Sequence, residues 1–159
     1  MTTPTATSAP QANPRLIALA HYAGRAILES VLARHGITFQ QSVTLRLAAV
    51  ADGPVDRARL VGEVVDALKI DEAAVHTVVE ELIEGRLLTA ESAALRITDA
   101  GRELYRTTSA ETSPISARIY AGIPAEELAA AGRVLSLITE RANAELTELS
   151  AVAGRRRNE

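Results

Sequence analysis

The side chains best suited to catalysis are few and badly spaced in this sequence. The histidines His21, His35 and His76 do not stand at the spacing of a metal-binding motif such as His-x-x-x-His. Glu80 and Glu81 are neighbours, so on a helix their carboxylates would point in different directions and could not share a proton. The chain has no Cys, no Gly-x-Ser-x-Gly segment and no glycine-rich phosphate loop. We therefore expect no enzymatic activity, no metal and no other cofactor.

Length and composition favour a helical globular protein. The chain has 159 residues, of which 47% are hydrophobic, and its formal net charge is -3. This length predicts one domain with tails, and Ala, Leu and Val make its core aliphatic. No apolar run approaches the roughly 18 residues that span a membrane, and the N-terminus lacks the regions of a secretion signal. We expect a cytoplasmic protein.

The two ends of the chain differ in composition from the rest. Residues 1–14 contain no charge and almost no large apolar group, so they are predicted to be a disordered tail. Residues 153–159 include three arginines and are predicted to be a loose basic tail, which is either simply solvated or able to touch phosphate. A single folded domain is expected over residues 15–152.

The first half of this domain shows helical periodicity. One helix is expected over residues 15–34, ended by Gly36. Thr38 with Gln41 has the spacing of a capping box, which predicts a second helix to about residue 51, where residues 52–54 break it. A third and a fourth helix are predicted to begin at caps formed by Asp56 and Asp71.

The period then changes from helical to alternating. Residues 87–89 and 94–97 read as two short strands joined by a turn at residues 90–93. Thr98 is a candidate cap for a fifth helix, which Ser113-Pro114 would kink or break. Pro124 is suited to the first position of a last helix.

The last helix carries an apolar seam with alternating steps of three and four residues, the spacing of a coiled coil. A small domain would expose this seam unless another surface covered it. The cover is either another part of the same chain or a second copy, and the terminal position of this long helix favours a dimer. The seam consists of Leu128, Ala131, Leu135, Ile138, Ala142 and Leu146.

Four segments, in order and at suitable spacing, resemble the MarR (multiple antibiotic resistance regulator) family. Residues 63–71 are similar to the family's Glu-Leu-Ala-x-x-Leu-x-Ile-Asp, and the apolar positions of residues 75–88 continue in register with it. Residues 95–102 are similar to its strand followed by Leu-Thr-x-x-Gly-Arg, and residues 123–128 to the loop and start of its final helix. The resemblance covers roughly residues 15–149. It implies a mainly α fold, a winged helix-turn-helix over residues 38–98 with a small two-stranded β wing. Residues 15–36 and 99–152 would form the helical dimerisation region of a homodimeric, ligand-responsive transcription regulator.

The resemblance also implies where the functional surfaces lie. In the family a recognition helix enters the major groove of double-stranded DNA, and a basic wing reaches the minor groove. Small aromatic or anionic ligands bind between the dimerisation helices and the winged helix-turn-helix regions. The candidates for DNA contact are Arg59, Ala74, His76, Thr77, Arg86 and Arg96. Those for ligand contact are His21, Tyr22, Arg25, Arg46 and Tyr105, although His21 and Tyr22 could simply pack at the dimer interface. Those for the dimer interface are Leu16, Leu19, Leu128, Leu135, Ile138 and Leu146.

The expected DNA-reading surface is poor in cations. Thr77 stands where the family usually has an Arg, and the expected wing turn carries Glu91 and no cation. From Thr44 to Arg106, eight Arg or Lys residues oppose twelve Asp or Glu residues, a net charge of -4. Because cations dominate DNA affinity, two interpretations stay open: a regulator with a weak or atypical DNA footprint, or a ligand- or partner-binding protein that has lost operator binding.

Overall fold

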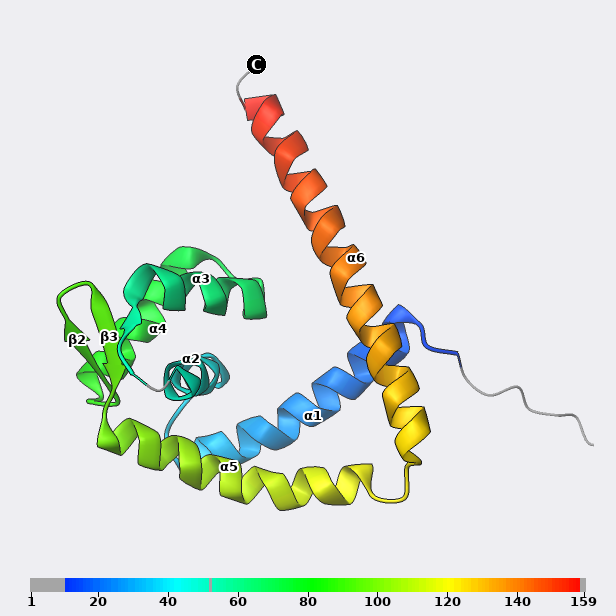
Figure 1. Ribbon diagram of the computed structural model, residues 1–159, viewed down its shortest axis with the longest axis horizontal. Helices are drawn as coiled ribbons and strands as arrows, with labels where there is room; N and C mark the ends of the chain where they lie inside the picture. The colour runs from blue at the N-terminus through cyan, green and yellow to red at the C-terminus, as the bar shows by residue number, and fades with distance from the viewer. Residues whose placement is uncertain (1–10, 52, 158–159) are drawn as a thin grey trace, which may run out of the picture. The chain divides into compact units, whose positions relative to one another are not determined.

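The structure is a computed structural model that describes residues 11–51 and 53–157. The described chain is built from helices and one small sheet (Figure 1). In chain order the elements are α1 (Pro14–Arg34), α2 (Phe39–Val50), β1 (Val55–Asp56), α3 (Arg57–Leu68), α4 (Glu72–Glu84), β2 (Leu88–Glu91), β3 (Ala94–Ile97), α5 (Asp99–Tyr120) and α6 (Ala125–Arg157).

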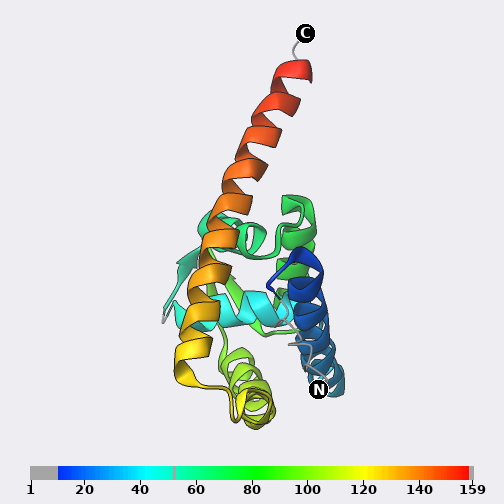
Figure 2. The same cartoon turned by 90° about the vertical axis from the view of Figure 1, so that its right-hand side faces the viewer.

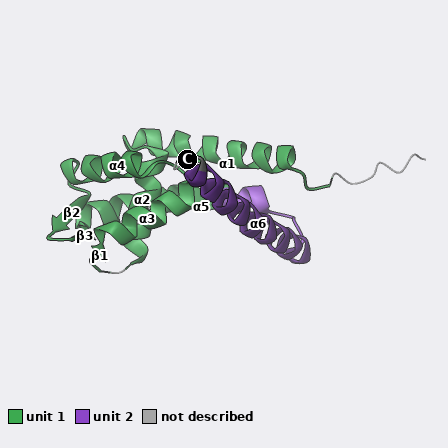
Figure 3. Cartoon of the chain, turned by 90° about the horizontal axis from the view of Figure 1, so that it is seen from above, with its two compact units in different colours: residues 1–115 green, residues 116–159 purple. Residues whose placement is uncertain are grey.

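The chain divides into two compact units, with the boundary inside α5 between Ile115 and Ser116 (Figure 3). The first unit contains α1 to α4, the sheet and most of α5. The second contains the end of α5 and the whole of α6, which is one long continuous helix (Figures 1 and 2).

The core of the first unit is aliphatic, as the composition predicted. It is formed by the inner faces of α2, α3 and α4 together with the strands. Burying one such side chain contributes roughly 1.5–3 kcal/mol, so this core holds the helix-turn-helix as a rigid body. Its fully enclosed members include Leu45, Leu60, Val64, Val75, Val79, Leu82, Leu88 and Leu95.

The predicted helix starts are mostly confirmed. Thr38 and Gln41 form the reciprocal capping box of α2, and the Asp56 carboxylate accepts the backbone N–H of Arg59 at 2.9 Å at the start of α3. Asp71 stands at the N-cap of α4, but its side chain makes no cap hydrogen bond, so that predicted cap is wrong.

The wing differs from the prediction in two ways. Ala90 and Glu91 pair with Leu95 and Ala94 on the opposite strand, so the turn consists of residues 92–93 rather than 90–93. The sheet also has a third strand, because Val55 pairs with Leu95, which gives the order β1-β3-β2. The strand β1 has only two residues, which is too short to show an alternation of apolar and polar side chains, so the sequence pattern did not predict it.

The ends of the folded region also extend further than predicted. Asn13 caps α1 by accepting the N–H of Leu16 at 3.0 Å, so residues 13 and 14 of the expected tail belong to the first helix and its cap, while residues 1–10 lie outside the described part. At the other end α6 runs to Arg157, so most of residues 153–159 belongs to a helix, and residues 158–159 lie outside the described part.

Of the kink or break expected at Ser113-Pro114, the break does not occur. Helix α5 continues through Pro114 to Tyr120. A proline inside a helix removes one backbone hydrogen bond, and its cost is local. The hydroxyl of Ser113 donates to the carbonyl of Ser109 at 2.7 Å, so this turn keeps a polar contact of its own.

Candidate DNA-reading surface and ligand cavity

Helices α3 and α4 form the helix-turn-helix. Lys69 ends α3 in the left-handed conformation, with φ of 54°, and its N–H bonds the carbonyl of Val65 at 2.7 Å. This reverses the chain within three residues. Val75, Val79 and Leu82 of α4 are then buried in the core, and the opposite face of α4 is left to solvent.

The predicted reading residues of α4 lie on or beside this outward face. Ala74 and Thr77 are exposed, and His76 is half-buried with Nε2 3.5 Å from the Glu72 carboxylate. The Thr77 hydroxyl donates to the carbonyl of Ala73 at 3.2 Å, within its own helix. The face therefore offers few free donors, as the sequence predicted.

Two of the predicted arginines are held by carboxylates of the same unit. Arg59 bonds Glu63 one turn along α3 at 2.8 Å. Arg96 of β3 donates two hydrogen bonds to Glu91 of β2, at 2.8 and 3.0 Å. This pair lowers the pKa of Glu91, because Arg96 stabilises the carboxylate, and raises the pKa of Arg96.

A third arginine of the helix-turn-helix makes the same kind of pair. Arg57 at the start of α3 contacts Glu80 on α4, across the two helices. No spacing rule connects these residues, which are 23 positions apart. Arg86, by contrast, is exposed in the turn after α4, in the left-handed conformation with φ of 58°.

Thr98 joins the base of the wing to α5. Its hydroxyl donates to the carbonyl of Arg86 at 2.7 Å and accepts the N–H of Gly101 at 3.0 Å, which confirms it as the cap of α5. Gly101 packs so closely that a Cβ there would lie 2.2 Å from the carbonyl oxygen of Leu87. The Thr-x-x-Gly spacing is therefore a steric requirement of this junction.

A cavity of about 330 Å³ lies between α1, α2 and α5. It contains two of the predicted ligand residues, Arg46 and Tyr105. The lining residues are Leu28, Phe39, Ser42, Val43, Arg46, Tyr105, Thr108, Ser109 and Thr112.

The other three predicted ligand residues do not line this cavity. His21 and Tyr22 are exposed on α1, with their rings 5.7 Å apart. Arg25 bonds Glu29 at 2.9 Å and lies over the ring of Phe39, with its guanidinium carbon 4.5 Å from the ring centroid. It reaches the cavity wall only through Phe39.

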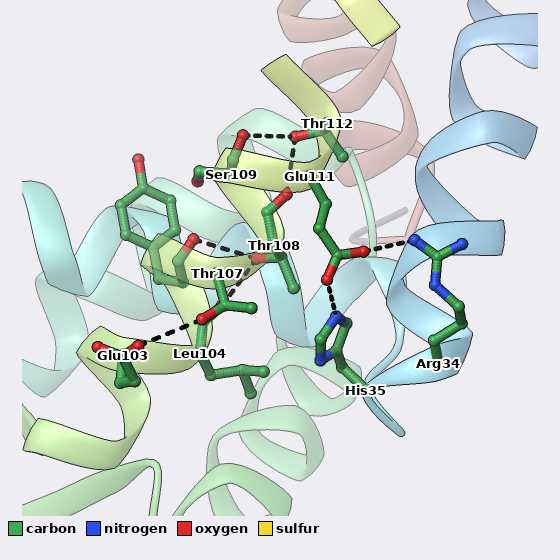
Figure 4. Close-up of polar contacts among 10 residues, drawn as sticks. Arg34, His35, Glu103, Leu104, Thr107, Thr108, Ser109, Glu111 and Thr112 are labelled. Carbon is green, nitrogen blue, oxygen red and sulfur yellow. Dashed lines mark hydrogen bonds and ion pairs between the residues drawn. The ribbon is translucent and has the colours of Figure 1, made fainter. Parts of the chain in front are cut away.

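Three hydroxyl-bearing residues of α5 were missed by sequence reasoning: Thr108, Ser109 and Thr112. They follow the predicted Tyr105 at helical spacing, so the four residues share one face of α5 and line the cavity together. That spacing was a signal available in the sequence. Thr108 is buried and donates to the carbonyl of Leu104 at 2.9 Å (Figure 4).

Beside the cavity, Glu111 ties α5 to the end of α1. One carboxylate oxygen contacts Arg34, and the other lies 2.8 Å from Nε2 of His35 (Figure 4). Arg34 first, and His35 second, lower the pKa of Glu111 by hydrogen bonding its ionised form. Glu111 belongs to α5, and Arg34 and His35 lie at the C-terminal end of α1. The cluster therefore fixes the distance between the two helices beside the cavity.

The predicted dimer residues are largely uncovered. On α1, Leu16 and Leu19 are exposed, and on α6 so are Leu135, Ile138 and Leu146, while Leu128 is half-buried. The apolar surface of α6 is wider than the predicted seam, since Val134, Leu137, Leu149 and Val152 are exposed as well. An apolar surface of this width on a single chain marks an interaction site.

Two further features bear on other functions. No cluster of three or more potential metal-ligating side chains occurs in the part of the chain that the structure describes. The expectation that no segment could span a membrane needs correction: α1 is long and apolar enough by length and composition. It is weak support for a span, because the same composition suits a helix that pairs with another protein surface, and Arg25 and Glu29 interrupt it.

A helix-turn-helix followed by a β hairpin defines a winged-helix protein. Comparisons of the sequence with protein-family models and with curated proteins found no match. In structure it is similar to MarR of Staphylococcus aureus in complex with salicylate and kanamycin, with a TM-score of 0.70, 20% identity, and coverage of 82% of this chain and 90% of that one. The chain thus has the fold of the MarR-family transcription regulators, as its sequence resemblance predicted.

Two further solved structures support the same fold. CouR from Rhodococcus jostii RHA1, bound to p-coumaroyl-CoA, has a TM-score of 0.67 and 20% identity, over 78% of this chain and 88% of that one. Bordetella bronchiseptica BpsR, whose DNA binding is regulated by 6-hydroxynicotinic acid, has a TM-score of 0.63 and 23% identity, over 80% of this chain and 94% of that one.

Proposed function

We propose that the chain is a homodimeric transcription regulator of the cytoplasm that binds double-stranded DNA and responds to a small ligand. The observation that carries this proposal is the helix-turn-helix itself: the core buries one face of α4 and leaves the other to solvent, next to a β2–β3 wing. This is the arrangement in which a helix enters the major groove. The proposed DNA-contacting residues are those selected from the sequence on α3, on α4 and at the wing.

The test is a binding titration with duplex from the region upstream of the protein's own coding sequence. We expect this duplex to bind more tightly than a scrambled duplex of the same composition. Thr77→Ala is expected to reduce the difference between the duplexes, since a good base contact contributes roughly 1–3 kcal/mol of discrimination. Thr147→Ala on α6 is the control and should leave the discrimination unchanged.

A second function is favoured by one observation. The exposed surface of α4 carries Glu72, Glu80, Glu81 and Glu84, and no Arg or Lys occurs between Asp71 and Gly85. Carboxylates repel phosphate, which favours a MarR-fold protein that binds a ligand or a protein partner and no operator. Absence of DNA binding even at low salt, with ligand binding retained, would establish this alternative in place of the regulator.

The proposed ligand is a small aromatic or anionic molecule. Arg46 supplies a guanidinium, Tyr105 supplies a ring and a hydroxyl, and Leu28 and Val43 supply apolar surface. Ligand pockets in proteins are typically about 300–1,000 Å³, so this cavity suits a molecule with one ring. The structurally similar proteins crystallised with salicylate or regulated by 6-hydroxynicotinic acid support this class of ligand.

Calorimetry with salicylate as the probe tests this site. We expect binding to weaken by about tenfold to a hundredfold in Arg46→Gln, because hydrogen bonds to charged groups contribute roughly 1.5–3 kcal/mol. Arg102→Gln is the control, since Arg102 is exposed on α5 and does not line the cavity. Equal affinity of wild type and Arg46→Gln would contradict the role of Arg46.

A further inference from the structure

We propose that Glu63, Glu80 and Glu91 act as a built-in electrostatic brake on DNA binding. Each of these carboxylates forms an ion pair with an arginine of the winged helix-turn-helix. The pairs are Glu63 with Arg59, Glu80 with Arg57, and Glu91 with Arg96. The inference rests on the proposed DNA-binding function and deepens it, because it says what limits the affinity of that surface.

The three pairs surround the helix-turn-helix. Arg59–Glu63 lies along the outer side of α3, Arg57–Glu80 bridges α3 and α4, and Arg96–Glu91 bridges the two wing strands. Each arginine thus stands on or beside an element that a winged helix presents to DNA. A guanidinium already bonded to a carboxylate offers a phosphate no net charge.

Two of the pairs are too exposed to contribute much to fold stability, and the third, Arg57–Glu80, is also open to solvent, with side chains 31% and 56% accessible. The side chains of Arg59 and Glu63 are 72% and 38% accessible, and those of Arg96 and Glu91 are 45% and 46% accessible. Exposed pairs of this kind contribute little to the stability of a fold, because water screens the charges and two long side chains must be ordered. Removing the carboxylates should therefore leave the fold intact, and solvent access leaves the arginines free to exchange partners.

Removing the three carboxylates should strongly change the affinity for DNA phosphates and its dependence on salt. Each phosphate neutralised by a protein cation adds about 0.9 to the slope of log K against log salt. Freeing three arginines would steepen this slope by up to about 2.7, so that a rise from about 50 to about 200 mM salt would weaken the variant about forty-fold more than the wild type. The brake therefore has a signature in the salt dependence as well as in the affinity.

The experiment uses the full-length protein and a duplex of random sequence, because phosphate contacts need no operator. The triple variant E63Q/E80Q/E91Q is compared with the wild type over a series of salt concentrations. The matched control E126Q/E127Q/E140Q removes the same number of negative charges from α6. Thermal unfolding followed by circular dichroism checks that each variant is folded.

We expect the triple variant to bind at least about tenfold more tightly at low salt and with a steeper slope, and the control to change much less. An equal gain in the control would overturn the brake, because net charge alone would then explain it. Binding by the wild type with no gain in the triple variant would overturn the brake and leave the proposed function standing. Absence of binding in every protein would overturn both.

A double-mutant cycle tests one pair directly. In the wild type, Arg96→Gln should cost little DNA affinity, because Glu91 already neutralises Arg96. In the Glu91→Gln background the same substitution should cost several-fold more. Equal costs in both backgrounds would show that Glu91 does not restrain Arg96.

Discussion

Gly101 shows at the scale of one residue how sterics dictate a sequence position. A Cβ at this position would meet the Leu87 carbonyl oxygen at 2.2 Å, and backbone cannot move aside easily. We expect Gly101→Ala to lower the free energy of unfolding by about 1–3 kcal/mol, the usual cost of overpacking. Urea denaturation of the purified protein measures this.

The control is another helical glycine. A Cβ at Gly62 of α3 would meet nothing within 4 Å. Gly62→Ala should therefore stabilise the protein by up to about 1 kcal/mol through helix propensity. If both substitutions had the same sign, the close contact at Gly101 would not control stability.

Glu111 links stability to pH. Arg34, and then His35, lower the pKa of this carboxyl below its usual value, so the carboxylate contributes stability that is present above the usual pKa and is lost as the pH falls through the folded pKa. We expect Glu111→Gln to be less stable than the wild type at neutral pH. The difference should shrink in acid, where both side chains are neutral.

Thermal unfolding of the two proteins at neutral and acidic pH is the measurement. Glu103→Gln is the control, because Glu103 pairs with the exposed Arg106 on its own helix and joins no other element. A stability difference between wild type and Glu111→Gln that stays constant with pH would show that the ionised carboxylate does not hold α1 to α5.

At the scale of elements, α5 is a continuous helix that contains an unfavourable residue. Pro114 has no N–H to donate to the preceding turn, and its ring crowds the carbonyl four residues earlier. Pro114→Ala is expected to stabilise α5 by up to about 3 kcal/mol, the difference in helix propensity between the two residues. Hydrogen exchange over residues 105–120 should slow in the variant.

The control substitution is Ala110→Pro, which places a second proline one turn earlier and should speed exchange in the same segment. Unchanged or faster exchange in Pro114→Ala would mean that the surroundings of α5 require the proline conformation, and that a straight helix is disfavoured there.

At the scale of the whole molecule, the uncovered apolar surface of α6 predicts assembly. We expect the wild type to sediment as a dimer, and Leu135→Asp to dissociate it or unfold it, because an unpaired carboxylate buried in the interface costs several kcal/mol. Analytical ultracentrifugation at micromolar concentration measures the dimer, and circular dichroism separates dissociation from unfolding.

Thr147→Asp introduces the same charge on the polar side of α6, by the helical period. It should leave the dimer intact. A wild type that sediments as a stable monomer would contradict the dimer, and equal effects of the two substitutions would place the interface elsewhere.

The features that depend on local spacing could be predicted from the residues alone. Residue types a few positions apart are enough to predict the helices, the capping box at Thr38, the cap at Thr98 and the lack of Arg and Lys on α4. Such interactions lie within one or two turns, so the linear pattern contains them. The sequence did not show that α5 continues past Pro114, because the local cost of a proline in a helix does not decide whether the helix continues beyond it.

The contacts between residues far apart in the chain could be seen only in the folded structure. It placed Arg46 and Tyr105 in one cavity and excluded His21 and Tyr22, and it paired Arg57 with Glu80. It also showed that Arg96, a predicted DNA contact, is bonded to Glu91. These outcomes depend on how helices and strands pack against a common core, and packing brings together side chains whose separation along the chain carries no periodic signal.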